Sequence, residues 1–313
     1  YSTERDLRKQ IWTAYNTRAI GGENDNTEIV KKIVDLRIKI ANILGYETYA
    51  DYALEERMAK NKLTVNEFIK NLLEPSMEFA KKDVADVYAF AKKNGFEDSQ
   101  LQSWDFSYWS EKYQQAEYSL SAEELKPYFQ LESCIDAVLG LATRLYGITF
   151  KELDNVPVYH PDVKVYEVND ADGRHLALFY ADFFPRASKR GGAWMTEFRG
   201  QSIRNGVEYR PFISTVMNFT KPTADAPALI THDELVTFLH EFGHALHGIF
   251  AEGRYGSLTG TNVSRDFVEL PSQIMENWAF EPEYLNSFAK HYQTGEPIPA
   301  ELIEKVVAAK NYL

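Results

Sequence analysis

Three of the seven histidines in this chain, His240, His244 and His247, fall within eight residues. The first two enclose a glutamate in the pattern His240-Glu241-x-x-His244. In an α-helix, side chains four positions apart lie on nearly the same face. His240 and His244 could therefore present two imidazole nitrogens to one metal ion. Glu241, about 100° around the helix, could act as a base toward a water molecule beside that metal.

The alternative interpretation is that these are two partly buried histidines satisfied by local hydrogen bonds. An accidental match to the pattern has odds of about one in a hundred in a chain of this composition, which favours the metal site. His247 follows His240 by seven residues and His244 by three. For His247 we expect a core or supporting role rather than metal binding.

A catalytic zinc site usually has three protein ligands and leaves a fourth position open to water. The candidates for the third ligand are the acidic residues Asp266, Glu269 and Glu276. A glycine-punctuated loop over 253–262 allows a second helix, expected from about Ser264, to return beside the first. On such a helix Glu269 shares a face with both other acids. We favour Glu269 as the ligand and either face-mate as the acceptor of a histidine N–H, with a solvated helix face or cap as the alternative for each acid.

Capping signals position these two helices. Residues 231–234 read Thr-His-Asp-Glu, a capping box that opens a helix expected to end near 248–252. Pro271 fits the second helix only within its first turn or at a bend.

Up to residue 147 the chain has helical periodicity, and beyond it short β-prone runs appear. We expect helices from Thr27 to Gly45, from the capping box at 64–67 to Asn94-Gly95 with a bend at Pro75, and from Pro127 to Gly147. The aromatic stretch 104–109 is interpreted as core packing. Expected strands are Lys164–Val168, His175–Phe184 and Arg210–Phe219, with a hairpin turn at 169–173. The prediction is a mainly α protein with a helical region at 1–147 and a catalytic zinc region at 148–313, which holds a small antiparallel sheet, without a clean boundary between them.

Composition excludes several classes of protein. The 313 residues are 44% hydrophobic, which excludes a disordered chain, and carry a formal charge of −12, which opposes a nucleic-acid partner. Cys134 is the only cysteine, so neither an internal disulfide nor a Cys₄ or Cys₂His₂ zinc site can form. No apolar run approaches the roughly 20 residues that a bilayer requires, and we expect no membrane partner.

Four segments together resemble the thimet oligopeptidase family (M3) of zinc metallopeptidases, nearest its bacterial peptidyl-dipeptidase (dipeptidyl carboxypeptidase) branch. They are HEFGHALH at 240–247, SLTGTNV at 257–263, DFVELPSQ at 266–273, and YADFFPR with KRGGAWM between 180 and 195. The resemblance implies one Zn²⁺ held by His240, His244 and Glu269, with Glu241 as the general base. It also implies a zincin-like, mainly helical fold with a deep channel. In that channel the strand at 175–184 would pair with an extended peptide.

The implied function is zinc-dependent hydrolysis of short unfolded peptides, with release of C-terminal dipeptides. The alternatives are an endo-acting oligopeptidase of the same family and a non-catalytic helical scaffold. In the family, a histidine and tyrosines from a segment well beyond the zinc helices bind substrate. This chain opens at Tyr1 without an initiator methionine and stops at 310–313, before such a segment. We therefore expect a fragment that is poorly active alone. We expect a cytoplasmic location, with a bacterial periplasm as the alternative, because a lone cysteine is compatible with both.

Overall fold

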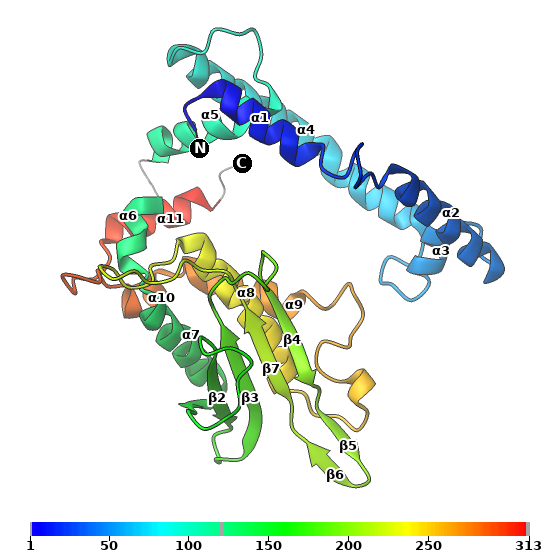
Figure 1. Ribbon diagram of the computed structural model, residues 1–313, viewed down its shortest axis with the longest axis vertical. Helices are drawn as coiled ribbons and strands as arrows, with labels where there is room; N and C mark the ends of the chain where they lie inside the picture. The colour runs from blue at the N-terminus through cyan, green and yellow to red at the C-terminus, as the bar shows by residue number, and fades with distance from the viewer. Residues whose placement is uncertain (1, 119–121, 311–313) are drawn as a thin grey trace. The chain divides into compact units, whose positions relative to one another are not determined.

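The computed structural model describes residues 2–118 and 122–310, which fall into two compact units, one in each range (Figure 1). The first unit is helical. Its elements are α1 (Arg5–Asn16), α2 (Thr27–Ile43), α3 (Tyr49–Leu54), α4 (Lys62–Lys93) and α5 (Ser103–Tyr118). The predicted helix after Thr27 is confirmed, and Gly45 follows its end with a φ of 88°.

The long helix α4 begins earlier than predicted. Asn61 is its N-cap, and the Asn61 side chain accepts a hydrogen bond from the backbone N–H of Thr64. Asparagine is a favourable N-cap residue because its side chain satisfies such a free N–H, so the helix begins directly after Asn61. The predicted capping box at 64–67 is wrong, and these residues lie inside the helix. The predicted packing role of the aromatic stretch is confirmed, since Trp109 is buried against Phe90 and Phe96.

The second unit combines helices with a small sheet. Its helices are α6 (Ala122–Leu125), α7 (Leu131–Tyr146), α8 (His232–Ile249), α9 (Leu270–Glu276), α10 (Pro282–Phe288) and α11 (Ala300–Ala309), with 3₁₀ turns η1 (Lys126–Tyr128), η2 (Gly256–Leu258) and η3 (Asn277–Phe280). Its strands are β1 (Thr149–Glu152), β2 (Lys164–Asn169), β3 (His175–Asp182), β4 (Trp194–Arg199), β5 (Ser202–Arg204), β6 (Val207–Tyr209) and β7 (Phe212–Val216). Within the two described ranges, none of the helices combines the length and the apolar character needed to cross a bilayer.

The predicted regions 1–147 and 148–313 follow the change from helices to strands. Contacts divide the chain differently, because α7 belongs to the same compact unit as the sheet. The predicted end of α7 is confirmed, since Gly147 caps the helix in the left-handed conformation with a φ of 72°. A left-handed residue at this position is easiest for glycine, which lacks a Cβ.

The main sheet has the order β1-β2-β3-β7-β4 and is mixed, which corrects the predicted antiparallel sheet. β3 and β7 pair in parallel, whereas the other neighbours are antiparallel. The reason is the long connection from β3 to β7, which contains β4 and the separate β5-β6 hairpin and returns the chain in the same direction. The three predicted strands and the turn between β2 and β3 are confirmed, while β1, β4, β5 and β6 were not predicted.

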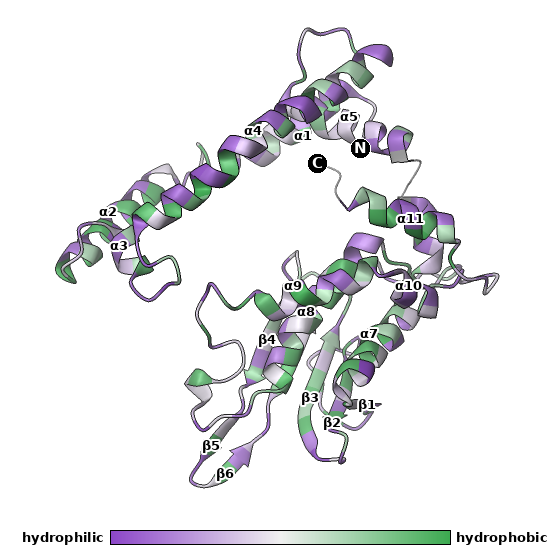
Figure 2. Ribbon diagram, turned by 180° about the vertical axis from the view of Figure 1, so that it is seen from behind, coloured by the Kyte–Doolittle hydropathy of each residue, from purple (hydrophilic) through white to green (hydrophobic). Residues whose placement is uncertain are grey.

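One face of the sheet packs against α8. Phe179 on β3 contacts Phe242 on α8 with ring centroids 5.7 Å apart, and Ile213 on β7 is fully buried beside Gly248. Helix α7 adds its apolar face to the same core, as the hydrophobic colouring of α7 and β3 in Figure 2 indicates. This core therefore holds α8 firmly against the sheet.

Helices α8 and α9 lie in close contact at Gly243. A Cβ placed on Gly243 would lie 2.5 Å from the carbonyl oxygen of Pro271 and 2.6 Å from Cα of Ser272. The capping box that opens α8 is confirmed, with both reciprocal hydrogen bonds between Thr231 and Glu234. The expected start of the second helix at Ser264 is wrong. A helix from that position would bring Pro271 into its interior, where the ring clashes with the preceding turn, so α9 begins at Leu270 with Pro271 in its first turn.

We predict that Gly243→Ala lowers the free energy of unfolding by about 1–3 kcal/mol, because the added methyl group must push the two helix backbones apart. Thermal unfolding followed by circular dichroism measures this change. Gly140→Ala in α7 is the matched control, since a Cβ at Gly140 meets nothing within 4 Å and alanine favours a helix. Equal stability of the two variants would contradict the account of this contact.

Candidate metal centre

The structure brings the three predicted metal ligands together. Nε2 of His240 lies 3.4 Å, and Nε2 of His244 lies 3.0 Å, from Oε2 of Glu269. The three ligand atoms all lie within 4.8 Å of one another. Tetrahedral zinc with bonds of 2.0–2.2 Å separates its ligand atoms by about 3.3–3.5 Å. The donor set and its spacing therefore fit a zinc ion without a large rearrangement.

Glu269 reaches the histidines from the turn just before α9. Its Oε2 accepts a hydrogen bond from the buried hydroxyl of Ser272 at 2.8 Å, and Ser272 also donates to the backbone carbonyl of Glu269. Burial by itself would raise the pKa of Glu269. The hydrogen bond from Ser272 and the proximity of His244 outweigh it, so the pKa is lowered and the carboxylate stays ionised.

Glu276 orients the first histidine. Its Oε1 lies 2.6 Å from Nδ1 of His240. An ionised carboxylate only accepts hydrogen bonds, so Nδ1 carries the proton and Nε2 is left free to bind a metal. The sequence left Asp266 and Glu276 as alternatives for this supporting role, and the geometry selects Glu276. Asp266 is not in the group of converging ligand atoms.

His244 is more enclosed than His240. Burial lowers the pKa of His244, which favours the neutral imidazole that a metal requires. Among residues 2–118 and 122–310, no group makes a hydrogen bond to its buried Nδ1.

The predicted base, Glu241, lies next to the ligands and is only 7% exposed. Burial raises its pKa, while the proximity of His240 and, more weakly, of the backbone N–H of Met195 on β4 act in the opposite direction. Glu241 lines a cavity of about 500 Å³ together with the three ligand side chains and strand β4. The other lining residues are Ala193, Trp194, Met195, Thr261, Arg265 and Val268. Base and ligands thus face one space.

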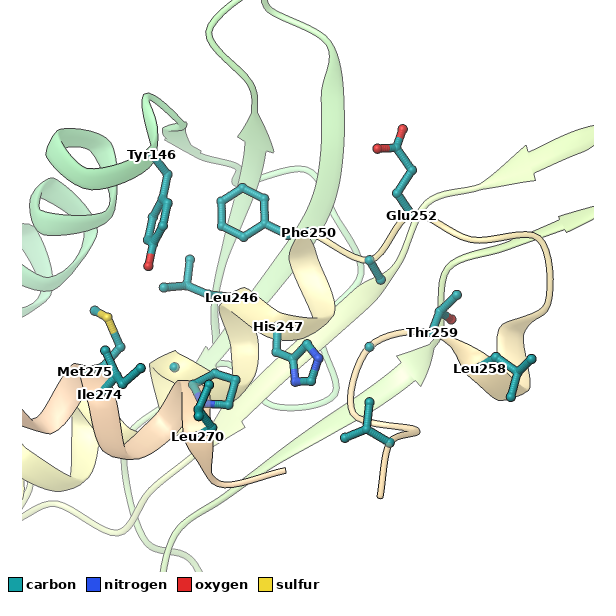
Figure 3. Close-up of a pocket in the computed structure, with 15 residues that line it drawn as sticks. Tyr146, Leu246, His247, Phe250, Glu252, Leu258, Thr259, Leu270, Ile274 and Met275 are labelled. Carbon is teal, nitrogen blue, oxygen red and sulfur yellow. The ribbon is translucent and has the colours of Figure 1, made fainter. Parts of the chain in front are cut away.

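His247 points elsewhere. It lines a separate, mainly apolar cavity of about 510 Å³ between the end of α8, the loop after it and α9 (Figure 3). Its ring contacts Phe267 with centroids 6.2 Å apart, and its buried Nδ1 has no hydrogen-bond partner in the described part of the chain. We expected either a core role or a supporting role for His247, and this placement corresponds to the core role.

The strand at 175–184 was expected to lie beside the metal and to pair with a peptide there. The strand beside the candidate ligands is instead β4. β3 is an interior strand, paired with β2 on one side and β7 on the other, so its backbone has no free edge for a peptide. β4 is the edge strand next to β7, and its first residues line the cavity of the ligands. Two of the four strand pairings in this sheet, β3 with β7 and β7 with β4, join strands that do not follow one another in the chain, and the sequence pattern does not reveal such pairings.

Two glycines let Glu197 anchor β4 to its surroundings. Burial raises the pKa of the Glu197 carboxyl group, while the nearby backbone N–H of Thr261 acts in the opposite direction. A Cβ on Gly260 would lie 2.3 Å, and one on Gly248 3.2 Å, from Oε1 of Glu197. The edge strand is thereby tied to both the metal helix and the loop that follows it.

Sequence reasoning missed Gly243, Ser272 and β4. Gly243 stands inside the histidine motif, where a helix-weakening glycine signals a close packing contact. Ser272 follows Glu269 by three residues at the start of a helix, a spacing at which a hydroxyl often bonds back to the backbone. For β4 the signal is the short alternating run Trp-Met-Thr-Glu-Phe after two glycines.

Comparison with known proteins identifies the family of this chain. The sequence pattern of peptidase family M3 matches residues 1–313. The chain belongs to peptidase family M3. The members of this family are metallopeptidases whose catalytic metal is generally zinc, and the zincin-like, mainly helical M3 fold was predicted correctly apart from the direction of strand pairing.

Curated relatives of this M3 chain carry two kinds of name. Oligopeptidase A of Escherichia coli (strain K12) is 41% identical over 319 residues, covering 100% of this chain and 47% of the relative. Dipeptidyl carboxypeptidase of Salmonella typhimurium is 41% identical over 307 residues, covering 97% of this chain and 44% of the relative. A thimet-like oligopeptidase of Dictyostelium discoideum is 32% identical, covering 99% of this chain and 48% of the relative. The chain spans about half the length of these relatives.

We predict that the purified M3 chain binds one zinc ion, measured by inductively coupled plasma mass spectrometry. His244→Ala and Glu269→Ala should lose the metal, whereas Glu241→Gln should retain it. Glu276→Ala should bind zinc about 10–100-fold more weakly, because it removes the partner that orients His240. Asp266→Asn is the control, and loss of zinc in that variant but not in His244→Ala would contradict the ligand assignment.

Proposed function

We propose that this M3 chain forms the zinc centre of a peptidase that hydrolyses short, unfolded peptides. The observation that carries the proposal is the convergence of His240, His244 and Glu269 beside the buried carboxylate of Glu241. Two neutral imidazoles and one carboxylate are a typical ligand set for catalytic zinc, and they leave a position for water.

Different residues of the chain transfer the proton and hold the reacting groups in place. When bound, zinc would lower the pKa of a water molecule and polarise the scissile carbonyl. Glu241 accepts the proton from the attacking water and passes it to the leaving amine. The backbone of Met195 lies beside the Glu241 carboxylate, and the Glu276 carboxylate fixes the ring of His240.

We further propose that the peptide lies along the free edge of β4. An edge strand offers N–H and C=O groups that an extended peptide can pair with. Because Trp194 and Met195 line the cavity of the ligands, a peptide paired there has its backbone beside Glu241 and the metal. Recognition through the backbone suits short unfolded peptides of varied sequence.

For the mode of cleavage we propose release of C-terminal dipeptides, with endo-acting cleavage as the second candidate. Both are supported by relatives of equal identity, one named dipeptidyl carboxypeptidase and one named oligopeptidase A. For location we propose the cytoplasm, which agrees with the name of an Arabidopsis thaliana relative, probable cytosolic oligopeptidase A.

We predict slow, zinc-dependent hydrolysis of a short peptide, measured by mass spectrometry of the products. The rate should be low, because the described residues that line the cavity include no tyrosine and no histidine besides the two ligands, and Arg265 is their one cationic side chain that could stabilise an oxyanion. Glu241→Gln should lower the rate by about 10²–10⁴-fold, as expected for loss of a general base, without loss of zinc. Removal of zinc with a chelator should abolish it. A rate that survives both changes would overturn the proposal.

We predict that the same peptide with an amidated C-terminus is cleaved much more slowly than the free acid, because a dipeptide-releasing enzyme must bind the terminal carboxylate. The matched comparison keeps sequence and length constant. Equal cleavage of the two peptides at an internal bond would favour the endo-acting candidate instead.

A further inference from the structure

A second cavity lies along β4, on the other face of the sheet. It has a volume of about 490 Å³. Its walls include Trp194, Thr196 and Phe198 of β4, which alternate with Met195 and Glu197 on the metal side. Trp194 lines both this cavity and the cavity of the ligands. The two spaces therefore flank the same edge strand and meet at one side chain.

The floor of the second cavity is formed by one row of paired residues that crosses β3, β7 and β4. Asp182 on β3 pairs with Val216 on β7, which pairs with Trp194 on β4. Residues in one such row point to the same face. The loop after β3 then contributes Arg186, Ser188, Lys189 and Arg190 to the wall above Asp182.

Asp182 is fully buried and its carboxylate is saturated with donors. Arg186 contacts both of its oxygens, at 3.0 and 2.9 Å, and Nζ of Lys189 lies 2.9 Å from Oδ1. The hydroxyl of Tyr159 donates to Oδ2 at 3.0 Å. One carboxylate thus meets two cations, which leaves the cluster with an excess of positive charge.

Arg190 adds a further positive charge. Its guanidinium lies over the ring of Trp194, 4.4 Å from the centroid. Among the described residues no acceptor takes a hydrogen bond from this guanidinium, so its donors are open to a ligand. The remaining charged pair nearby, Asp162 and Lys221, is internally neutral, with Nζ 2.5 Å from Oδ2.

We infer that this cavity is a subsite for an acidic side chain of the peptide, and that Arg190 is the residue that selects for it. The inference rests on the proposed function, because a peptide paired with β4 turns alternate side chains toward this face. The aromatic walls from Trp194 and Phe198 accommodate the methylene groups of a glutamate, and Arg190 meets its carboxylate.

The experiment measures peptide binding by fluorescence anisotropy in the zinc-loaded Glu241→Gln protein, which does not consume the peptide. Labelled peptides carry Glu, Gln or Lys at each of three positions on either side of the bond to be cleaved. At one or more alternate positions, the peptide with Glu should bind about tenfold more tightly than the peptide with Gln. This ratio corresponds to about 1.4 kcal/mol, roughly the contribution of one charge-assisted hydrogen bond. Arg190→Gln should abolish this ratio, and Arg190→Glu should favour Lys.

Arg204→Gln is the matched control, because Arg204 also lies over an aromatic ring but belongs to β5, and does not line the cavity. Its Glu-to-Gln ratio should equal that of the parent. Equal binding of Glu and Gln peptides, or a preference unchanged in Arg190→Gln, would overturn the subsite and leave the proposed peptidase function intact. Absence of binding by every peptide would contradict both proposals.

Discussion

The backbone contact between α8 and α9 at Gly243 is the constraint on which the metal centre depends. His240 and His244 lie on one helix, whereas Glu269, Ser272 and Glu276 lie on or beside the other. The three ligand atoms can converge only if the two helices approach without an intervening side chain, and a Cβ on Gly243 would lie 2.5 Å from a backbone oxygen of Pro271. Glycine is needed here for space rather than for an unusual φ. The close approach also places Glu276 within hydrogen-bond reach of His240.

The sheet supplies the second half of the site through its edge strand. α8 packs on the sheet through Phe242 and Gly248, and the backbone of Met195 on β4 lies beside Glu241. One short strand therefore lies beside the base, lines the ligand cavity on one face and lines a basic, aromatic cavity on the other. Because these functions share β4, its attachment through Glu197 contributes to the geometry of each of them.

The sequence predicted those parts of the site that depend on local geometry. The histidine spacing and the capping box at Thr231 lie within one helix, where a fixed number of residues per turn determines which side chains meet. The prediction of Glu269 as the ligand assumes a helix from about Ser264, but residues 264–269 do not form a helix. Glu269 nevertheless lies beside the histidines, because a turn before Pro271 brings its carboxylate to them. The strand order could not be predicted, because β3 and β7 are separated in the chain by the three strands β4, β5 and β6. The alternating pattern of β4 does not indicate which strand it pairs with.

The most direct test of this account is the zinc affinity of Gly243→Ala, measured by competition with a chromophoric chelator. The substitution leaves every proposed ligand in place and alters only the distance between the two helices. We predict that zinc binds at least about tenfold more weakly than in the parent chain, comparable with the loss of a residue that orients a ligand. An unchanged affinity in the folded variant would show that Glu269 reaches the histidines without this helix contact, and would contradict the account.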